Sequence, residues 1–139
     1  MINGEVVHPE ILKVLANSGH GNQIVIADGH FPFSSKGPAS ATRVYLNYAP
    51  GLIKVPDILG PLLKMIDVEA VAAPAPDDGS EPAIWPEYRK LLPKHLQIKK
   101  LGRFEFYDMV DSPNTTLLIA SGDTRTYACI VLSFGVRKL

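Results

Sequence analysis

The sequence predicts an α/β fold in which one sheet is covered by helices on both faces. Short apolar segments recur along the chain, and apolar patterns with helical spacing lie between them. Strands that are apolar throughout are typical of a sheet buried on both sides. The length of 139 residues suits one domain, residues 1–139, which can bury a core without disulfide or metal support.

Local signals define the elements of the N-terminal part. A helix is expected from Pro9 to about Ser18, because proline is tolerated in the first turn and Gly19 is a typical stop. The apolar run at residues 23–27 predicts a strand. Residues 29–40 are rich in Gly, Pro and Ser and predict a loop, and residues 43–46 predict a short strand.

The middle of the chain predicts a helix, a strand and a loop. Residues 55–66 place apolar side chains on one helical stripe, but Gly60 and Pro61 are expected to kink this helix or delay its start. Residues 68–73 predict a buried strand. The segment PAPDDGSEP, residues 74–82, predicts a surface loop.

Five further elements complete the pattern. We expect a helix at residues 85–92, with proline in its first turn, and a strand at residues 96–100. The segment RFEFYDMV, residues 103–110, fits helical and alternating patterns, and we favour a helix. Residues 115–120 and 129–134 are rich in β-branched and apolar side chains and predict two late strands.

Composition excludes several classes of protein. Fourteen basic residues balance fourteen acidic ones with no basic run, so nucleic acid is not an expected partner. The single cysteine cannot form an internal disulfide. The start MINGEVVHPE lacks signal-peptide features and no apolar run is long enough for a membrane span, so a soluble cytoplasmic protein is expected.

Polar residues flank the predicted strand at residues 23–27. Asp28 follows its carboxyl end, where ligand sites form in open α/β sheets, although an aspartate before glycine also commonly bonds its own backbone. His20 lies between two glycines that leave its ring accessible, and a solvated turn histidine is the simpler interpretation. His30 is open to the same two interpretations, a structural or solvated role or a place in a site.

Other candidate site residues are equally ambiguous when each is considered alone. Arg103 is either a surface charge or a fork that donates hydrogen bonds to hydroxyl and carboxylate groups. Tyr127 is either strand packing or a pocket phenol, whereas Trp85 and Tyr88 are most simply helix packing. No two of the four histidines have the i, i+4 spacing of metal ligands and one thiol cannot build a Cys-rich site, so no metal is expected.

Three segments together are more specific than any single residue. HPEILKVLANSGHGNQIVIADGHFP, residues 8–32, resembles the amino-terminal signature of the D-ribose pyranase and L-fucose mutarotase family. RFEFY at residues 103–107 and SGDTRTYACIVLSFGV at residues 121–136 extend the resemblance over essentially the whole chain.

The resemblance implies a fold and an activity. The fold is a single three-layer α/β/α domain with a mixed sheet. The activity is that of an isomerase, a mutarotase that interconverts the anomers or ring forms of a free monosaccharide such as L-fucose, without cofactor or metal. Members assemble into rings, commonly decamers of two stacked pentamers, so a homo-oligomer is expected.

The resemblance also implies roles for individual residues. His20 corresponds to the general acid/base, and imidazole suits this work because both protonation states are populated near neutral pH. Asp28 corresponds to a sugar-binding residue. Arg103 opens the Arg-Phe-x-Phe-Tyr motif, where the ribose branch usually has histidine, and therefore favours the fucose branch.

The last family contact is a Tyr-x-Asn run, which here reads Tyr127, Ala128 and Cys129. A thiol is a poor donor and acceptor, so the amide hydrogen bond to sugar is lost, although main-chain groups of the run can still bind. Two other functions stay open: a ribose pyranase, and a sugar-binding or regulatory protein without catalysis. Phe31 and Tyr107 are candidates for packing against the apolar side of the sugar.

Overall fold

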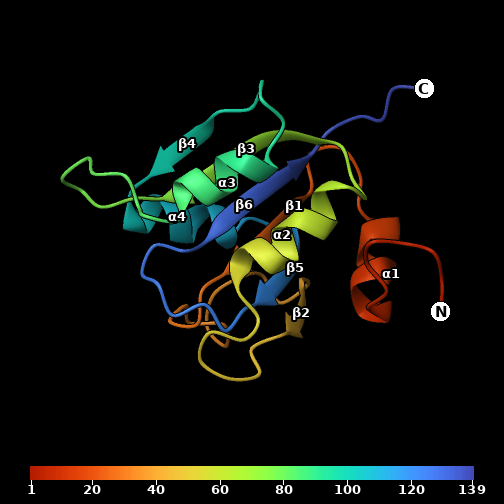
Figure 1. Ribbon diagram of the computed structural model, residues 1–139, viewed down its shortest axis with the longest axis horizontal. Coiled ribbons are helices and arrows are strands. Elements are labelled where there is room, and N and C mark those ends of the chain that lie inside the picture. Colours follow the sequence, from red (N-terminus) through yellow and green to blue (C-terminus); the bar gives the residue numbers. More distant parts are fainter.

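The computed structural model describes residues 1–139 and contains four helices and six strands (Figure 1). The helices are α1 (Pro9–Asn17), α2 (Val55–Leu63), α3 (Trp85–Leu91) and α4 (Arg103–Val110). The strands are β1 (Gln23–Ala27), β2 (Thr42–Tyr45), β3 (Val68–Pro74), β4 (Ile98–Leu101), β5 (Thr115–Ala120) and β6 (Ile130–Phe134).

All six strands form one mixed sheet in the order β2-β5-β1-β6-β3-β4. Strand β5 pairs in parallel with β1 and β2, and β3 pairs in parallel with β4. Strand β6 is antiparallel to both of its neighbours, β1 and β3. The other five strands therefore run in one direction, and their carboxyl ends lie at the same edge of the sheet.

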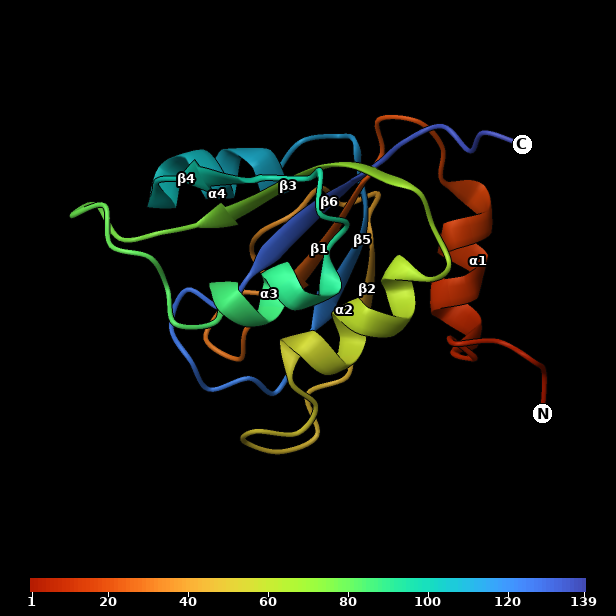
Figure 2. The same cartoon turned by 45° about the horizontal axis from the view of Figure 1, so that its top comes forward.

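Helices cover both faces of the sheet, which gives three layers (Figure 2). Helices α2 and α3 lie on one face and α4 lies on the other. Successive side chains of β1 point to opposite faces of the sheet. Ile24 and Ile26 belong to the core beneath α2 and α3, whereas Val25 belongs to the core beneath α4. The uniformly apolar pattern of this strand follows from its burial on both faces.

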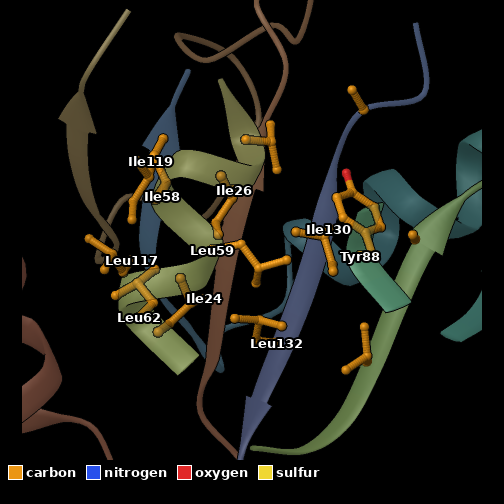
Figure 3. Close-up of a cluster of buried hydrophobic side chains, with 14 of the residues drawn as sticks. Ile24, Ile26, Ile58, Leu59, Leu62, Tyr88, Leu117, Ile119, Ile130 and Leu132 are labelled. Atoms are coloured by element: carbon orange, nitrogen blue, oxygen red, sulfur yellow. The ribbon is translucent and has the colours of Figure 1, made fainter. Parts of the chain in front are cut away.

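The larger core lies between the sheet and helices α2 and α3. Figure 3 shows Ile24 and Ile26 of β1 near Leu59 of α2, and Tyr88 of α3 next to Ile130 of β6. Leu59 and Tyr88 are fully buried, and complete burial of a leucine side chain contributes about 2 kcal/mol. None of the helices has both the length and the apolar character to cross a membrane.

The predicted elements are all present, and their ends are displaced by at most two residues except at α2, which ends at Leu63, three residues before the predicted end at residue 66. The segment 103–110 is the predicted helix, and Trp85 and Tyr88 are buried, as expected of helix packing. Of the two effects expected of Gly60 and Pro61, a kink or a delayed start, the delayed start is wrong: the helix begins at Val55 and continues through both residues. A glycine has no Cβ to clash with the ring of the proline that follows it, and the buried apolar face of α2 offsets the missing backbone donor.

The turn after β5 is packed against the loop between β2 and α2. The Gly122 N–H donates to the Ile53 carbonyl at 2.7 Å, and the Gly122 carbonyl accepts from the Gly51 N–H at 2.6 Å. A Cβ atom at Gly122 would overlap the carbonyl oxygens of Leu52 and Ala49. Only glycine allows this close approach, which fixes where the following segment begins.

Gly122→Ala is therefore expected to lower the free energy of unfolding by about 2 kcal/mol, because backbone atoms must move to admit the methyl group. Urea unfolding measures the change. Gly19→Ala is the matched control, since a Cβ there meets nothing within 4 Å, and its change should stay below about 0.5 kcal/mol. Equal stability of the two variants would show that the close approach is not maintained in solution.

Candidate functional site

A cavity of about 300 Å³ opens at the carboxyl ends of β1, β3 and β4. This volume is at the lower end of the range for small-molecule sites. The edge of the sheet is the one predicted from the position of Asp28. The lining residues are Asp28, His30, Phe31, Pro74, Arg103, Phe106, Tyr107, Thr126, Tyr127 and Cys129.

The buried carboxylate of Asp28 links two segments that border the cavity. Its Oδ1 accepts from the backbone N–H of His30 at 2.9 Å. Its Oδ2 accepts from the backbone N–H of Ala128 at 3.1 Å and from the thiol of Cys129 at 3.3 Å. A carboxylate has about four acceptor positions, so Asp28 organises the cavity and keeps capacity for a ligand hydroxyl.

Cys129 is buried against Asp28, and its sulfur also accepts from the Asp28 backbone N–H at 3.3 Å. Burial, followed by the nearby charge of Asp28, raises the pKa of the Cys129 thiol well above its ordinary value of 9.0. The group therefore remains a protonated thiol that donates to the carboxylate. Burial likewise raises the pKa of Tyr88, whose hydroxyl donates to the Cys129 carbonyl at 3.3 Å.

Arg103 is the first residue of α4 and also lines the cavity. Its guanidinium lies 5.6 Å from the ring centroid of Tyr107 and 5.8 Å from that of Phe104. The side chain forms none of the ion pairs or side-chain hydrogen bonds of the chain, in contrast to Arg43 and Arg125. Its planar set of N–H donors is therefore available to a ligand.

Aromatic rings form an apolar wall of the cavity. The centroid of Phe31 lies 5.7 Å from that of Phe106 and 6.1 Å from that of Tyr107, both in edge-on arrangements. Tyr127 lines another part of the cavity and has a φ of 58°. This left-handed conformation is uncommon for a residue other than glycine and persists only where its surroundings hold it.

His30 combines the two interpretations left open by the sequence, since it makes a structural hydrogen bond and also lines the cavity. Its Nε2 lies 2.9 Å from the Thr124 carbonyl, which can only accept, so Nε2 carries the proton. The ring also lines the cavity. Pro74 and Thr126 are lining residues that sequence reasoning missed, because neither residue type signals a site and both reach the cavity only through the tertiary fold.

His20 does not lie in this cavity. It belongs to the turn before β1, at the opposite end of the strand from Asp28, and the strand alone separates them by roughly 15 Å. Its side chain is 60% exposed, and its Nε2 lies 3.0 and 2.9 Å from the two carboxylate oxygens of Glu69. The chain thus brings together Asp28 with the other predicted binding residues, Arg103, Tyr127, Ala128 and Cys129, but not with His20.

A charged cluster supports the segment that carries Tyr127. Arg125 donates from Nε and Nη2 to the two oxygens of buried Asp123, at 2.9 and 2.8 Å, and Nη1 pairs with Glu87 of α3. The Val55 N–H at the start of α2 also donates to Asp123, at 3.2 Å. Burial opposes ionisation of Asp123, but these hydrogen bonds outweigh it and hold its pKa below the ordinary value of 3.8.

No three His, Cys, Asp or Glu side chains are grouped so that they could hold a metal ion.

The raised pKa of Cys129 predicts an unreactive thiol, because the thiolate is the nucleophile. Iodoacetamide at pH 8 should modify the native protein at least roughly a hundredfold more slowly than the protein unfolded in urea. Mass spectrometry measures both rates. Similar rates in the two states would contradict the burial and protonation of this thiol.

Arg125→Met should lower the free energy of unfolding by about 2 kcal/mol at pH 7, because Asp123 stays buried without its charged partner. A carboxylate with a lowered pKa contributes stability that is present above the ordinary value of 3.8 and is lost as pH falls through the folded value. The difference between wild type and variant should therefore shrink on acidification to pH 2. Urea unfolding at both pH values measures this.

The control is Arg89→Met, which removes an exposed ion pair with Glu81 and should leave the free energy of unfolding nearly unchanged at either pH. A loss for Arg125→Met that does not depend on pH would mean that the guanidinium acts by packing and not through the ionised Asp123.

Comparison with known proteins places the chain in a family. The sequence profile of the RbsD/FucU transport protein family matches residues 1–137. The chain is 32% identical to human fucose mutarotase over 147 residues, covering 96% of this chain and 92% of that protein. It resembles Bacillus subtilis RbsD complexed with D-ribose, with a TM-score of 0.84, 27% identity and coverage of 99% and 100% of the two chains. It also resembles fucose mutarotase in complex with L-fucose from Streptococcus pneumoniae, with a TM-score of 0.81, 26% identity and the same coverage. The chain belongs to the RbsD/FucU family.

Proposed function

We propose that the protein is a monosaccharide mutarotase of the fucose type that works without a cofactor. The observation that carries the proposal is the cavity itself: an unpaired guanidinium, a buried carboxylate and a phenol surround a space of about 300 Å³ with an aromatic wall. Relatives named fucose mutarotase, and related structures in complex with L-fucose or D-ribose, support a sugar as the ligand.

Each part of the cavity suits a different part of a sugar. Arg103 offers several N–H donors to hydroxyl oxygens, whereas Asp28 accepts from a hydroxyl group. Tyr127 adds a phenol that both donates and accepts. The rings of Phe31 and Tyr107 provide an apolar surface for the C–H face of the sugar.

The reaction needs only proton transfers. The anomeric hydroxyl gives its proton to a base as the bond from C1 to the ring oxygen breaks, and the ring oxygen takes a proton from an acid. The products are the open-chain aldehyde and a hydroxyl group, and reversal after rotation of C1 forms the other anomer. We assign the base to His20, because a well-placed imidazole supplies about 10² to 10⁴ in rate, and the Tyr127 phenol is the candidate acid.

His20 can act at a cavity only if a second copy of the chain supplies it. The ring lies at the far end of β1 from Asp28 in its own chain and is exposed. We therefore propose a homo-oligomer in which His20 of one copy adjoins the cavity of the next. A head-to-tail contact of this kind forms a ring when its rotation closes. The decamer of two stacked pentamers, implied by the family resemblance, is the assembly that we expect.

Two observations each favour an alternative function. The similarity to RbsD in complex with D-ribose favours ribose pyranase as the second candidate, and comparing the exchange of L-fucose and D-ribose separates the two. Cys129 in place of the family asparagine favours a sugar-binding protein without catalysis. Calorimetric binding of a sugar whose anomer exchange is not accelerated would identify that case.

His20→Ala should reduce catalysed anomer exchange at least about a hundredfold, because the variant lacks the group that carries the proton. Saturation-transfer NMR on L-fucose, D-ribose and related hexoses measures the exchange directly. His8→Asn is the matched control: it also removes an imidazole, but it keeps a side chain that caps α1, where His8 now accepts from the Ile11 N–H. An unchanged exchange rate in His20→Ala would remove His20 from the mechanism.

A further inference from the structure

The imidazole of His20 is held by one partner, the carboxylate of Glu69. We propose that Glu69 is a positioning residue that fixes the His20 ring with its proton on Nε2, so that Nδ1 is the nitrogen that exchanges a proton with the sugar. This role rests on the proposed function. Glu69, a residue of β3, would then act through His20 without touching the substrate.

The hydrogen bonds determine which nitrogen is protonated. Nε2 lies 3.0 Å from Oε1 and 2.9 Å from Oε2 of Glu69. An ionised carboxylate can only accept, so Nε2 must be the donor. The other nitrogen of a neutral ring then carries a lone pair, and no group of the chain occupies it. A carboxylate that fixes the tautomer and orientation of an imidazole is a recurring device in acid–base catalysis.

A β-bulge in β3 sets the direction of the Glu69 side chain. Val68 pairs with Phe134 and Ala70 pairs with Ser133, so Glu69 is the extra residue of a β-bulge. A bulge re-aims a side chain and bends the strand locally, and such bulges are common beside active sites. Regular alternation from Val68 would have placed Glu69 within the ladder, as an ordinary member of the sheet surface.

Three backbone hydrogen bonds hold the histidine turn beside this bulge. The Gly21 N–H donates to the Phe134 carbonyl at 3.1 Å, and the Phe134 N–H donates to the Asn22 carbonyl at 2.9 Å. The Gly135 N–H donates to the Asp67 carbonyl at 2.7 Å. The turn before β1, the end of β6 and the start of β3 are thereby joined, although the two paired side chains are 49 residues apart in sequence.

Stability alone does not explain the pair. The side chains are 60% and 46% exposed, and exposed ion pairs contribute little to folding. The exposure leaves the far edge of the ring open to a second copy of the chain. Once a neighbouring cavity covers the ring and excludes water, the same hydrogen bond acts more strongly on its orientation.

Two substitutions of Glu69 and one control test the role. Glu69→Ala removes the acceptor, and Glu69→Gln keeps an acceptor oxygen without the charge. Asp67→Asn removes a carboxylate two residues away whose side chain has no hydrogen bond in the chain. The ¹⁵N signals of the imidazoles, recorded by magic-angle spinning on sedimented protein with labelled histidine, report the tautomer whatever the size of the assembly. His20→Ala assigns the His20 signals.

At a pH where the ring is neutral, wild-type His20 should show a protonated Nε2 and an unprotonated Nδ1. In Glu69→Ala both signals should move towards the averaged values of a ring that exchanges between tautomers. Anomer exchange at saturating sugar should fall about tenfold or more, with less than a twofold change in KM, because sugar binding does not involve Glu69. Asp67→Asn should match wild type in both measurements.

A protonated Nδ1 in wild type, or unchanged nitrogen signals in Glu69→Ala, would overturn the proposal. So would an unchanged exchange rate in both Glu69 variants of an active wild type. If Glu69→Ala does not fold, Glu69→Gln decides, because loss of the charge alone should still slow exchange. A wild type that exchanges no sugar would refute the proposed function, while the nitrogen spectra would still test the pairing of Glu69 with His20.

Discussion

The geometry of the cavity depends on one buried carboxylate. Asp28 receives hydrogen bonds from the backbone of His30 on one side and from Ala128 and Cys129 on the other. These groups come from segments 100 residues apart in sequence, the loop after β1 and the run before β6. Burying a carboxylate is costly unless its oxygens are paired, so the two segments must stay together. Tyr127 is held beside this point, in a backbone conformation that it would rarely adopt alone.

The direction of the strands separates the cavity from His20 within one chain. The carboxyl end of β1 carries Asp28 and the cavity, whereas its amino end carries the turn with His20. A residue at one end of a strand cannot reach a ligand at the other. The same chain therefore presents a binding cavity at one edge of the sheet and a histidine at the other. Association of copies is then part of the proposed chemistry.

Much of the fold could be predicted because its signals are local. The apolar runs, the prolines in first turns and the helical stripes predicted the ends of the elements to within three residues. The strand order could not be read from them, because it depends on which pairs bury the most apolar surface in three dimensions. The continuous α2 shows the same limit: the burial of its apolar face, a tertiary effect, outweighed the local signal of Gly60 and Pro61.

Only part of the candidate site could be predicted, because some of its residues have a local or family signal and others are brought together only by the tertiary fold. Asp28 was found from its position after a strand, and Arg103, Tyr127, Ala128 and Cys129 from the family resemblance, and the fold brings all five to the cavity or its hydrogen bonds. Their roles towards a sugar stay predictions. Glu69 gave no sequence signal, because its pairing depends on a bulge and on three backbone hydrogen bonds between distant segments.

The most direct test of the central claim mixes two variants that are each deficient for a different reason. His20→Ala keeps an intact cavity, and Arg103→Ala keeps an intact histidine. If His20 acts on the cavity of a neighbouring copy, co-refolding equal amounts should restore about one quarter of wild-type anomer exchange, because half of the cavities are intact and half of their neighbours carry His20. Mixed assemblies of wild-type size that stay as inactive as either variant alone would contradict the claim.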